Sequence, residues 1–124
     1  MIRVTGLHHA SILVGDTARA LRFYRDVLGL PPASQRPALG YPGAWLETGQ
    51  GQQLHLLELP GAGRGGAAGH GGRDYHLAFA VADLDAAVAA LQAAGIDFTL
   101  SRSGRRALFC RDPDGNALEL VELA

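Results

Sequence analysis

The sequence has little cysteine and almost no net charge, and each of these features excludes some classes of protein and partner. A single cysteine, Cys110, among 124 residues excludes an intramolecular disulfide framework, which fits a reducing compartment or a fold that is indifferent to oxidation. Lysine and arginine together number 11 and aspartate and glutamate 12, so the formal charge is −1. Such a balance gives no electrostatic footprint for nucleic acid or for an anionic membrane surface. We therefore expect small molecules or proteins as partners.

Long apolar segments are also missing. No window approaches the roughly 18 apolar residues that a membrane span needs. The N-terminal stretch MIRVTGLHHA has neither the apolar length nor the cleavage site of a secretory signal. With 48% hydrophobic residues, the chain can nevertheless fill a core. These features predict a soluble, cytoplasmic protein with one compact domain or two small modules.

The first half of the chain has the pattern of a strand, a helix and at least two further strands. HASILVGD, residues 9–16, predicts a strand that ends at a helix cap. Apolar residues then recur along one face of a helix over residues 18–28, and Gly29 ends that helix. GAWLETG and QQLHLLEL, residues 43–49 and 52–59, predict two strands around a glycine turn.

The second half repeats this order. HLAFAVAD, residues 76–83, predicts another strand with an aspartate cap, followed by a helix over residues 84–94. FTLSRSG and RRALFCRD are strand candidates, and a DPDG turn leads into the last strand, NALELVEL, at residues 116–123. We predict a first module over 1–60, a Gly-rich linker over 61–73 and a second module over 74–124. The stretch PGAGRGGAAGHGGR between the halves has nothing that can pack a core.

The repeat has a fixed register. A step of 67 residues relates His9 to His76, and a step of 64 residues relates His55 to Glu119. This regularity indicates an internal duplication of a strand, helix and strand unit. A lone histidine on a strand is more often a core residue than a ligand. Here, however, all four equivalent positions carry side chains that can bind a metal.

Three imidazoles and one carboxylate form a donor set that suits a divalent transition metal. Nitrogen ligands favour zinc, iron, nickel or copper, and one anionic oxygen offsets part of the positive charge. By the period of two, His76 shares its side of the strand with Ala78 and Ala80, and such small neighbours would leave a cavity. The pattern therefore predicts a rigid metal site carried by strands.

Three stretches, GLHHASILVGDTARALRFYRDVLGL, DYHLAFAVADL and DPDGNALEL, resemble the vicinal oxygen chelate superfamily, and the resemblance covers nearly the whole chain. That superfamily includes glyoxalase I, bleomycin resistance proteins and extradiol dioxygenases. The resemblance implies an α+β fold in which two βαβββ modules pair into a curved mixed sheet around a metal cavity. It implies His9 and His76 as first-strand ligands and Glu119 as a last-strand ligand. His55 stands where glyoxalases carry a glutamate, and an imidazole cannot serve as the same displaceable carboxylate base.

The resemblance also implies a metal-dependent, glyoxalase-like lyase or isomerase that acts on a small substrate with adjacent oxygens. Glu119 would be a ligand and proton acceptor, and His55 a fourth ligand or general base. The divalent ion would be zinc, nickel, iron, manganese or cobalt. The alternatives are a drug-binding protein of the bleomycin resistance type without catalysis, an antibiotic-modifying thiol transferase, and a small dioxygenase. A homodimer is expected, with the modules pairing within or between chains.

Overall fold

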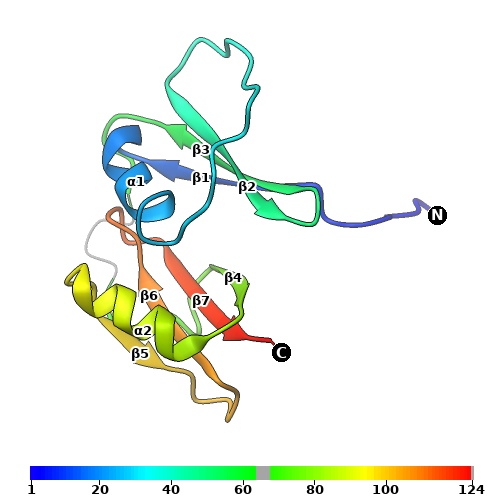
Figure 1. The fold of residues 1–124 in the computed structure, drawn as a ribbon. Coiled ribbons are helices and arrows are strands. Elements are labelled where there is room, and N and C mark those ends of the chain that lie inside the picture. Colours follow the sequence, from blue (N-terminus) through cyan, green and yellow to red (C-terminus); the bar gives the residue numbers. More distant parts are fainter. Residues whose placement is uncertain (64–67, 124) are drawn as a thin grey trace. The chain divides into compact units, whose positions relative to one another are not determined.

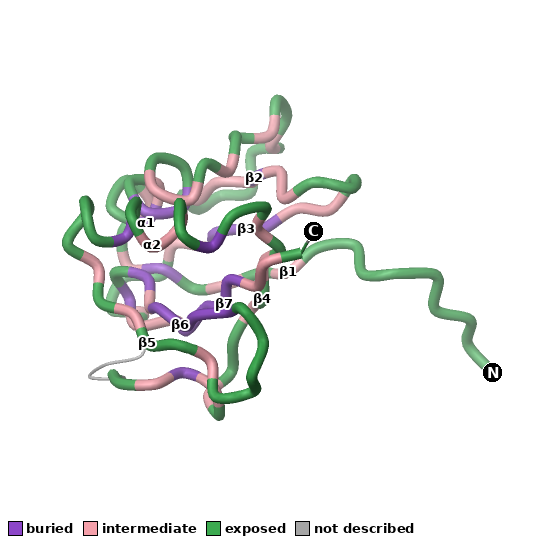
Figure 2. Tube along the Cα trace, turned by 60° about the horizontal axis from the view of Figure 1, so that its bottom comes forward, coloured by how far each residue is buried: buried purple, intermediate pink, exposed green. Residues whose placement is uncertain are grey.

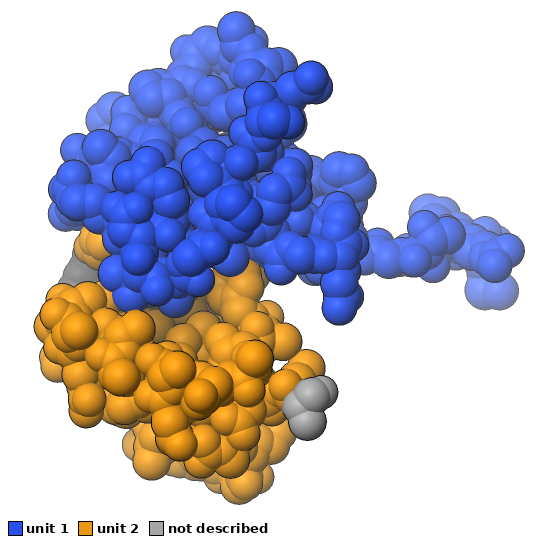
Figure 3. All heavy atoms as spheres, viewed as in Figure 1, with its two compact units in different colours: residues 1–62 blue, residues 63–124 orange. Residues whose placement is uncertain are grey.

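The computed structural model describes residues 1–63 and 68–123, and the chain divides into two compact units (Figure 3). Unit 1 comprises Met1–Ala62 and unit 2 comprises Gly63–Ala124. Each unit contains one helix and one mixed sheet (Figure 1). The predicted α+β class is therefore confirmed. Residues 64–67 of the predicted linker lie outside the described residues.

Unit 1 is built around the strand that carries His55. β3 lies in the centre of a three-stranded sheet, parallel to β1 and antiparallel to β2, and α1 packs on β2 and β3. Leu54 and Leu56 of β3 are buried, together with Phe23 of α1. The elements of this unit are β1 (His9–Val14), α1 (Thr17–Tyr24), β2 (Gly43–Gly49) and β3 (Gln52–Glu58).

The strand that would complete a βαβββ order in unit 1 is present only as a rudiment. Pro32 forms an isolated bridge with Leu46, and Glu47 donates its backbone N–H to the carbonyl of Pro31 at 2.8 Å. Proline has no N–H to donate, so a segment with two consecutive prolines cannot extend the ladder. The first module is therefore βαββ with a single additional bridge.

Unit 2 has the complete βαβββ order that the sequence predicts. Its sheet has the strand order β4-β7-β6-β5, with β4 parallel to β7, and α2 contacts β7. Burial is most continuous along β6 and β7 (Figure 2). The elements are β4 (His76–Val81), α2 (Leu84–Ala93), β5 (Phe98–Leu100), β6 (Ala107–Arg111) and β7 (Ala117–Glu122).

Both helices begin in the same way, which shows the duplication in atomic detail. Asp16 and Asp83 are the N-cap residues, and each carboxylate accepts the backbone N–H of the residue three positions later. From the last strand of each unit, Glu58 and Glu122 accept the N–H of the first helical residue at 2.7 and 2.8 Å. The first N–H groups of a helix have no partners within the helix, and here two carboxylates per helix accept from them. The negative charge of these carboxylates also interacts favourably with the positive end of the helix dipole.

The buried thiol of Cys110 on β6 should make the protein less stable in alkaline solution. The residue is 4% exposed, and burial, with a smaller effect from Asp112, raises the pKa of its thiol from 9.0 to about 11. The unfolded chain therefore loses this proton first as the pH rises from 9 to 11. We expect the free energy of unfolding to fall by about 2 kcal/mol over this range because of this thiol.

Urea unfolding at several pH values between 8 and 11 checks this expectation. The matched variant is Cys110→Ala, which should be less stable at pH 8 but should lack the thiol's share of the alkaline decline. Comparing the two proteins cancels the contribution of every other group that ionises over this pH range. Parallel declines in both proteins would contradict the prediction.

Candidate metal centre

His9 and His55 lie together on one face of the unit 1 sheet. Side chains alternate along a strand, so His55 projects from the opposite side to Leu54 and Leu56. The parallel register places Ser11 beside His55, and His9 is two residues before Ser11 on the same side. The two imidazole rings are stacked, with centroids 4.1 Å apart and planes 17° apart.

A hydrogen-bonded relay fixes the tautomer of His55. Gln53 donates its amide Nε2–H to Oε1 of Glu47 at 3.0 Å, because a carboxylate can only accept. The amide oxygen of Gln53 is thereby directed to Nε2 of His55 at 2.9 Å. Nε2 of His55 therefore carries the proton and donates it to Gln53, which leaves the lone pair on Nδ1. Sequence analysis did not predict this relay, although Gln53 stands two positions before His55 on the same side of the strand.

The surroundings of His55 also keep its imidazole neutral. Burial is the main reason that the pKa of His55 lies below its ordinary value of 6.5, and positive charge on His9, His8 and Arg36 lowers it further. The residue is only 7% exposed. A neutral imidazole with an available lone pair is the form that binds a metal ion.

His76 and Glu119 form the equivalent pair in unit 2. Ala78 lies beside Glu119 in the parallel register of β4 and β7, as Ser11 lies beside His55 in unit 1. Glu119 is 4% exposed. Its Oε2 lies 3.4 Å from Nε2 of His76. The step of 67 and the step of 64 therefore place the two pairs in the same structural positions.

The hydrogen bonds of His76 leave an acceptor nitrogen opposite the carboxylate. Nδ1 of His76 lies 2.9 Å from the backbone carbonyl of Asp74, which can only accept, so Nδ1 carries the proton. Nε2 then presents a lone pair toward Oε2 of Glu119. A proton on either atom, a bridging water or a metal ion would satisfy both acceptor atoms. Metal-bound histidines commonly have such a second hydrogen bond to a carbonyl.

The separation of these two atoms suits a shared metal ion. Ligand nitrogen and oxygen atoms lie about 2.0–2.2 Å from a zinc-like ion, so neighbouring ligand atoms are about 2.8–3.6 Å apart at octahedral to tetrahedral angles. The 3.4 Å between Nε2 of His76 and Oε2 of Glu119 falls within this range. The residues of unit 2 therefore fit a divalent metal, although a protonated His76 would fit the same distance.

Arg105, from the turn between β5 and β6, contacts the other oxygen of Glu119. Its Nη2 donates to Oε1 of Glu119 at 2.9 Å, while the arginine side chain is 60% exposed. One carboxylate oxygen thus faces an arginine and the other faces His76. The sequence did not predict this pairing, because the two residues are 14 positions apart and Arg105 belongs to a short run of polar turn residues.

An aromatic side chain accompanies each pair. Trp45 is the cross-strand partner of His55, and the two rings are stacked with centroids 4.1 Å apart and planes 4° apart. Phe109 occupies the equivalent place opposite Glu119, and its ring meets that of His76 edge to face at 5.1 Å. These contacts restrict the rotation of both imidazoles.

Part of the predicted Gly-rich linker packs on the unit 2 sheet. Nδ1 of His70 lies 2.6 Å from the hydroxyl of Thr99, and the His70 ring contacts Phe109 at 4.9 Å. Gly71 is buried, and a Cβ there would overlap the side chain of Ala117 at 2.8 Å. The segment over residues 68–73 therefore borders the ring that contacts His76.

The structure thus gathers the four predicted ligands as two pairs, His9 with His55 and His76 with Glu119. Within residues 1–63 and 68–123, no three or more side chains of histidine, cysteine, aspartate and glutamate are grouped so that they could hold a metal ion. Over the same ranges, every helix is too short or too polar to cross a membrane.

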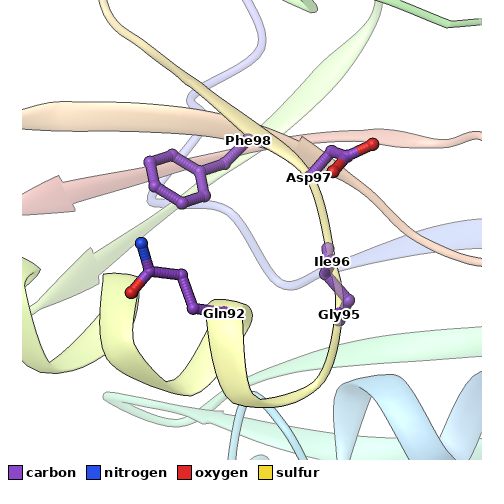
Figure 4. A pocket seen from close by; sticks show the side chains of 5 residues that line it. All are labelled: Gln92, Gly95, Ile96, Asp97 and Phe98. Atoms are coloured by element: carbon purple, nitrogen blue, oxygen red, sulfur yellow. The ribbon is translucent and has the colours of Figure 1, made fainter.

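A shallow pocket lies elsewhere in unit 2. Its volume is about 340 Å³, and it is open to solvent at the end of α2 and the start of β5 (Figure 4). β5 and β4 form opposite edges of the sheet, so this pocket is remote from His76. It offers a single carboxylate and no histidine, which is a poor donor set for a metal. The lining residues are Gln92, Gly95, Ile96, Asp97 and Phe98.

The duplicated architecture and the paired ligands define a class of α+β proteins with candidate metal ligands on the first and last strands of each module. The family model described as the Glyoxalase/Bleomycin resistance protein/Dioxygenase superfamily matches residues 6–120, and the chain belongs to this superfamily. The resemblance to the vicinal oxygen chelate superfamily is thereby confirmed.

Individual relatives are similar over nearly their full lengths. Lactoylglutathione lyase of Haemophilus influenzae is 32% identical over 121 residues, which cover 92% of this chain and 90% of that protein. A glyoxalase/dioxygenase of Nostoc punctiforme has 26% identity and a TM-score of 0.79, over 97% of this chain and 92% of the other. A fosfomycin resistance protein of Listeria monocytogenes, solved with manganese(II) and a dihydroxypropylphosphonic acid, has 16% identity and a TM-score of 0.76, over 98% and 95%. The last similarity concerns the fold.

Proposed function

We propose that the protein is a metal-dependent lyase or isomerase of the glyoxalase type, acting on a small substrate with two adjacent oxygens. The observation that carries the proposal is the acceptor nitrogen of His76 facing the buried carboxylate of Glu119 at 3.4 Å. A metal ion would satisfy both acceptor atoms of this pair. A protein of the same fold solved with manganese(II) supports a metal ion rather than a proton alone.

In this proposal His9, His55, His76 and Glu119 all contribute ligands to one divalent ion, which would be zinc, nickel, iron, manganese or cobalt. When bound, the metal would polarise a substrate oxygen and stabilise negative charge that develops on it. His55 would donate its Nδ1 lone pair, because the Gln53 relay occupies Nε2.

The chain's own groups would also move the substrate proton. Glu119 is the first candidate base, since an exchange of partners would free one oxygen of its buried carboxylate to accept a proton. Arg105 would retain the other oxygen and hold the carboxylate in position. If His55 does not bind the ion, it is the second candidate base, because its imidazole is neutral and its Nδ1 is unprotonated.

Metal analysis is the experiment that tests the proposal. Protein purified without added metal, stripped by chelation and then titrated should bind about one divalent ion per chain, as expected for four ligands and one ion. Reloaded protein should then be screened against vicinal carbonyl, catechol and antibiotic substrates. Failure to bind any of the five metals in folded protein would contradict the proposal and favour a drug-binding protein without catalysis. Oxygen consumption with a catechol would instead indicate a dioxygenase.

A homodimer and a cytoplasmic location stay predictions from the sequence. Sedimentation equilibrium of the metal-free and metal-loaded protein would test the dimer directly. If modules from two chains complete one site, dilution should weaken metal binding, because dissociation would separate the ligands.

A further inference from the structure

We propose that unit 1 contains a subsite for an anionic oxygen group, bound by the Nε–H of Arg36 and the Nε1–H of Trp45 beside His55. The inference rests on the proposed function, because it assigns a carboxylate or a phosphate-like group to the substrate. It adds a binding residue, Arg36, that the metal proposal does not use.

The first observation is that both groups are donors without an acceptor. Nε of Arg36 and Nε1 of Trp45 are buried, and neither has a hydrogen-bond partner among the described residues. Each of these nitrogens carries a hydrogen and can only donate. Buried donors are nearly always paired in native proteins, so two unpaired donors indicate an acceptor that binds between or beside them.

The second observation is that both side chains lie on the face of the unit 1 sheet that carries His55. The indole of Trp45 is stacked on His55 at 4.1 Å. A Cβ on Gly43 would lie 3.0 Å from Nη2 of Arg36, and Gly43 is two residues before Trp45 on β2. That spacing places both residues on one side of the strand. Arg36 is also close enough to lower the pKa of His55.

The chemistry of the donors selects the ligand. One is part of a permanent cation, and the other is a neutral N–H. A guanidinium binds a carboxylate or phosphate oxygen more strongly than a neutral carbonyl, because the hydrogen bond is charge-assisted. Nη2 of Arg36 already donates to the carbonyl of Tyr41 at 3.0 Å, and the guanidinium lies 5.5 Å from the Tyr41 ring centre. The side chain is thus anchored at one end while Nε keeps its hydrogen for a ligand.

A ligand can reach these covered nitrogens if the segment that carries Arg36 moves. Residues 37–42 are exposed, and Arg36 itself is half-buried, so few packing contacts oppose a displacement. The substrate would then present an anionic group near Trp45 and its two adjacent oxygens toward the proposed metal ligands.

Intrinsic fluorescence tests the subsite directly, because Trp45 is the only tryptophan in the chain. Metal-stripped and dialysed protein should be titrated with inorganic phosphate and with acetate, with chloride at equal ionic strength as the control. We expect a saturable change in emission with at least one of the two anions and none with chloride. A response to phosphate alone would assign a phosphate or phosphonate group, and a response to acetate alone would assign a carboxylate.

Variants then locate the binding. Arg36→Met should weaken the apparent affinity by about 10-fold, the value of one charge-assisted hydrogen bond. Arg22→Met, on the exposed side of α1, is the matched control and should leave the affinity unchanged. Trp45→Phe keeps an aromatic ring beside His55 but lacks the N–H, and the rise in Tm that the anion produces should shrink in this variant.

The outcome separates this inference from the metal proposal. Folded wild-type protein that responds to neither anion, or Arg36→Met that binds as well as wild type, would overturn the subsite. If the protein binds a metal but no anion, only the proposed subsite is contradicted. If it binds the anion but no metal, the proposed catalytic function is contradicted.

Discussion

Replacing Glu119 by glutamine is expected to weaken divalent metal binding by at least about 100-fold, since the loss of even an outer-shell partner of a metal ligand costs 10–100-fold. Glu119 is the one anionic group in the proposed ligand set, and its Oε2 lies 3.4 Å from Nε2 of His76. The amide has the same shape but no charge. Calorimetric titration of the stripped variant with zinc, nickel and manganese measures the change.

The matched control is Glu122→Gln, three residues further along β7. Glu122 accepts from Arg106 at 2.9 Å and from the first N–H of α2, so its loss should lower stability. Glu122 lies on the opposite side of β7 from Glu119, so this variant should leave metal affinity unchanged. Equal metal affinities for the two variants would show that Glu119 is not a ligand. Circular dichroism of both proteins would confirm that each is folded.

The internal repeat explains why the pairs could be predicted from sequence alone. Strand side chains alternate, and the register of a parallel pair is the same in both units, so equal sequence steps give equal positions in space. The arithmetic that relates His55 to Glu119 also relates Trp45 to Phe109, which lie opposite them on the neighbouring strands. The helix N-caps, and the end of the second helix just before Gly95, follow from the local chemistry of one or two residues. The predicted end of the first helix at Gly29 is wrong, because α1 ends at Tyr24.

Features that depend on particular side-chain conformations were not predictable in this way. The Arg105 contact joins a turn to a strand, and no periodicity relates the two. The single bridge at Pro32 replaces a strand because a proline has no backbone N–H to donate. The relay through Gln53 depends on the orientation of an amide that Glu47 determines. The way in which the two modules associate does not follow from the alternation of side chains along strands. Strand periodicity therefore predicts each pair of ligands but not how the two pairs meet.

Replacing Gly43 by alanine is expected to reduce the free energy of unfolding by about 3 kcal/mol, at the upper end of the range for overpacked sites. A Cβ at this position would overlap the backbone carbonyl oxygen of Leu56 on the adjacent strand and approach Nη2 of Arg36 at 3.0 Å. An arginine end can move, but the carbonyl cannot move without disturbing the pairing of Gly43 with Leu57. Urea unfolding followed by Trp45 fluorescence measures the loss, because Trp45 is on the same strand.

Gly6→Ala is the appropriate control for this substitution. A Cβ at Gly6 meets nothing within 4 Å, and its backbone does not have the positive φ that alanine disfavours. Its effect should stay within about 0.5 kcal/mol, as for most exposed positions. A similarly small effect of Gly43→Ala would mean that β2 and β3 can separate slightly at no cost, and the stacked rings of Trp45 and His55 on those strands would then be held less rigidly than their geometry implies.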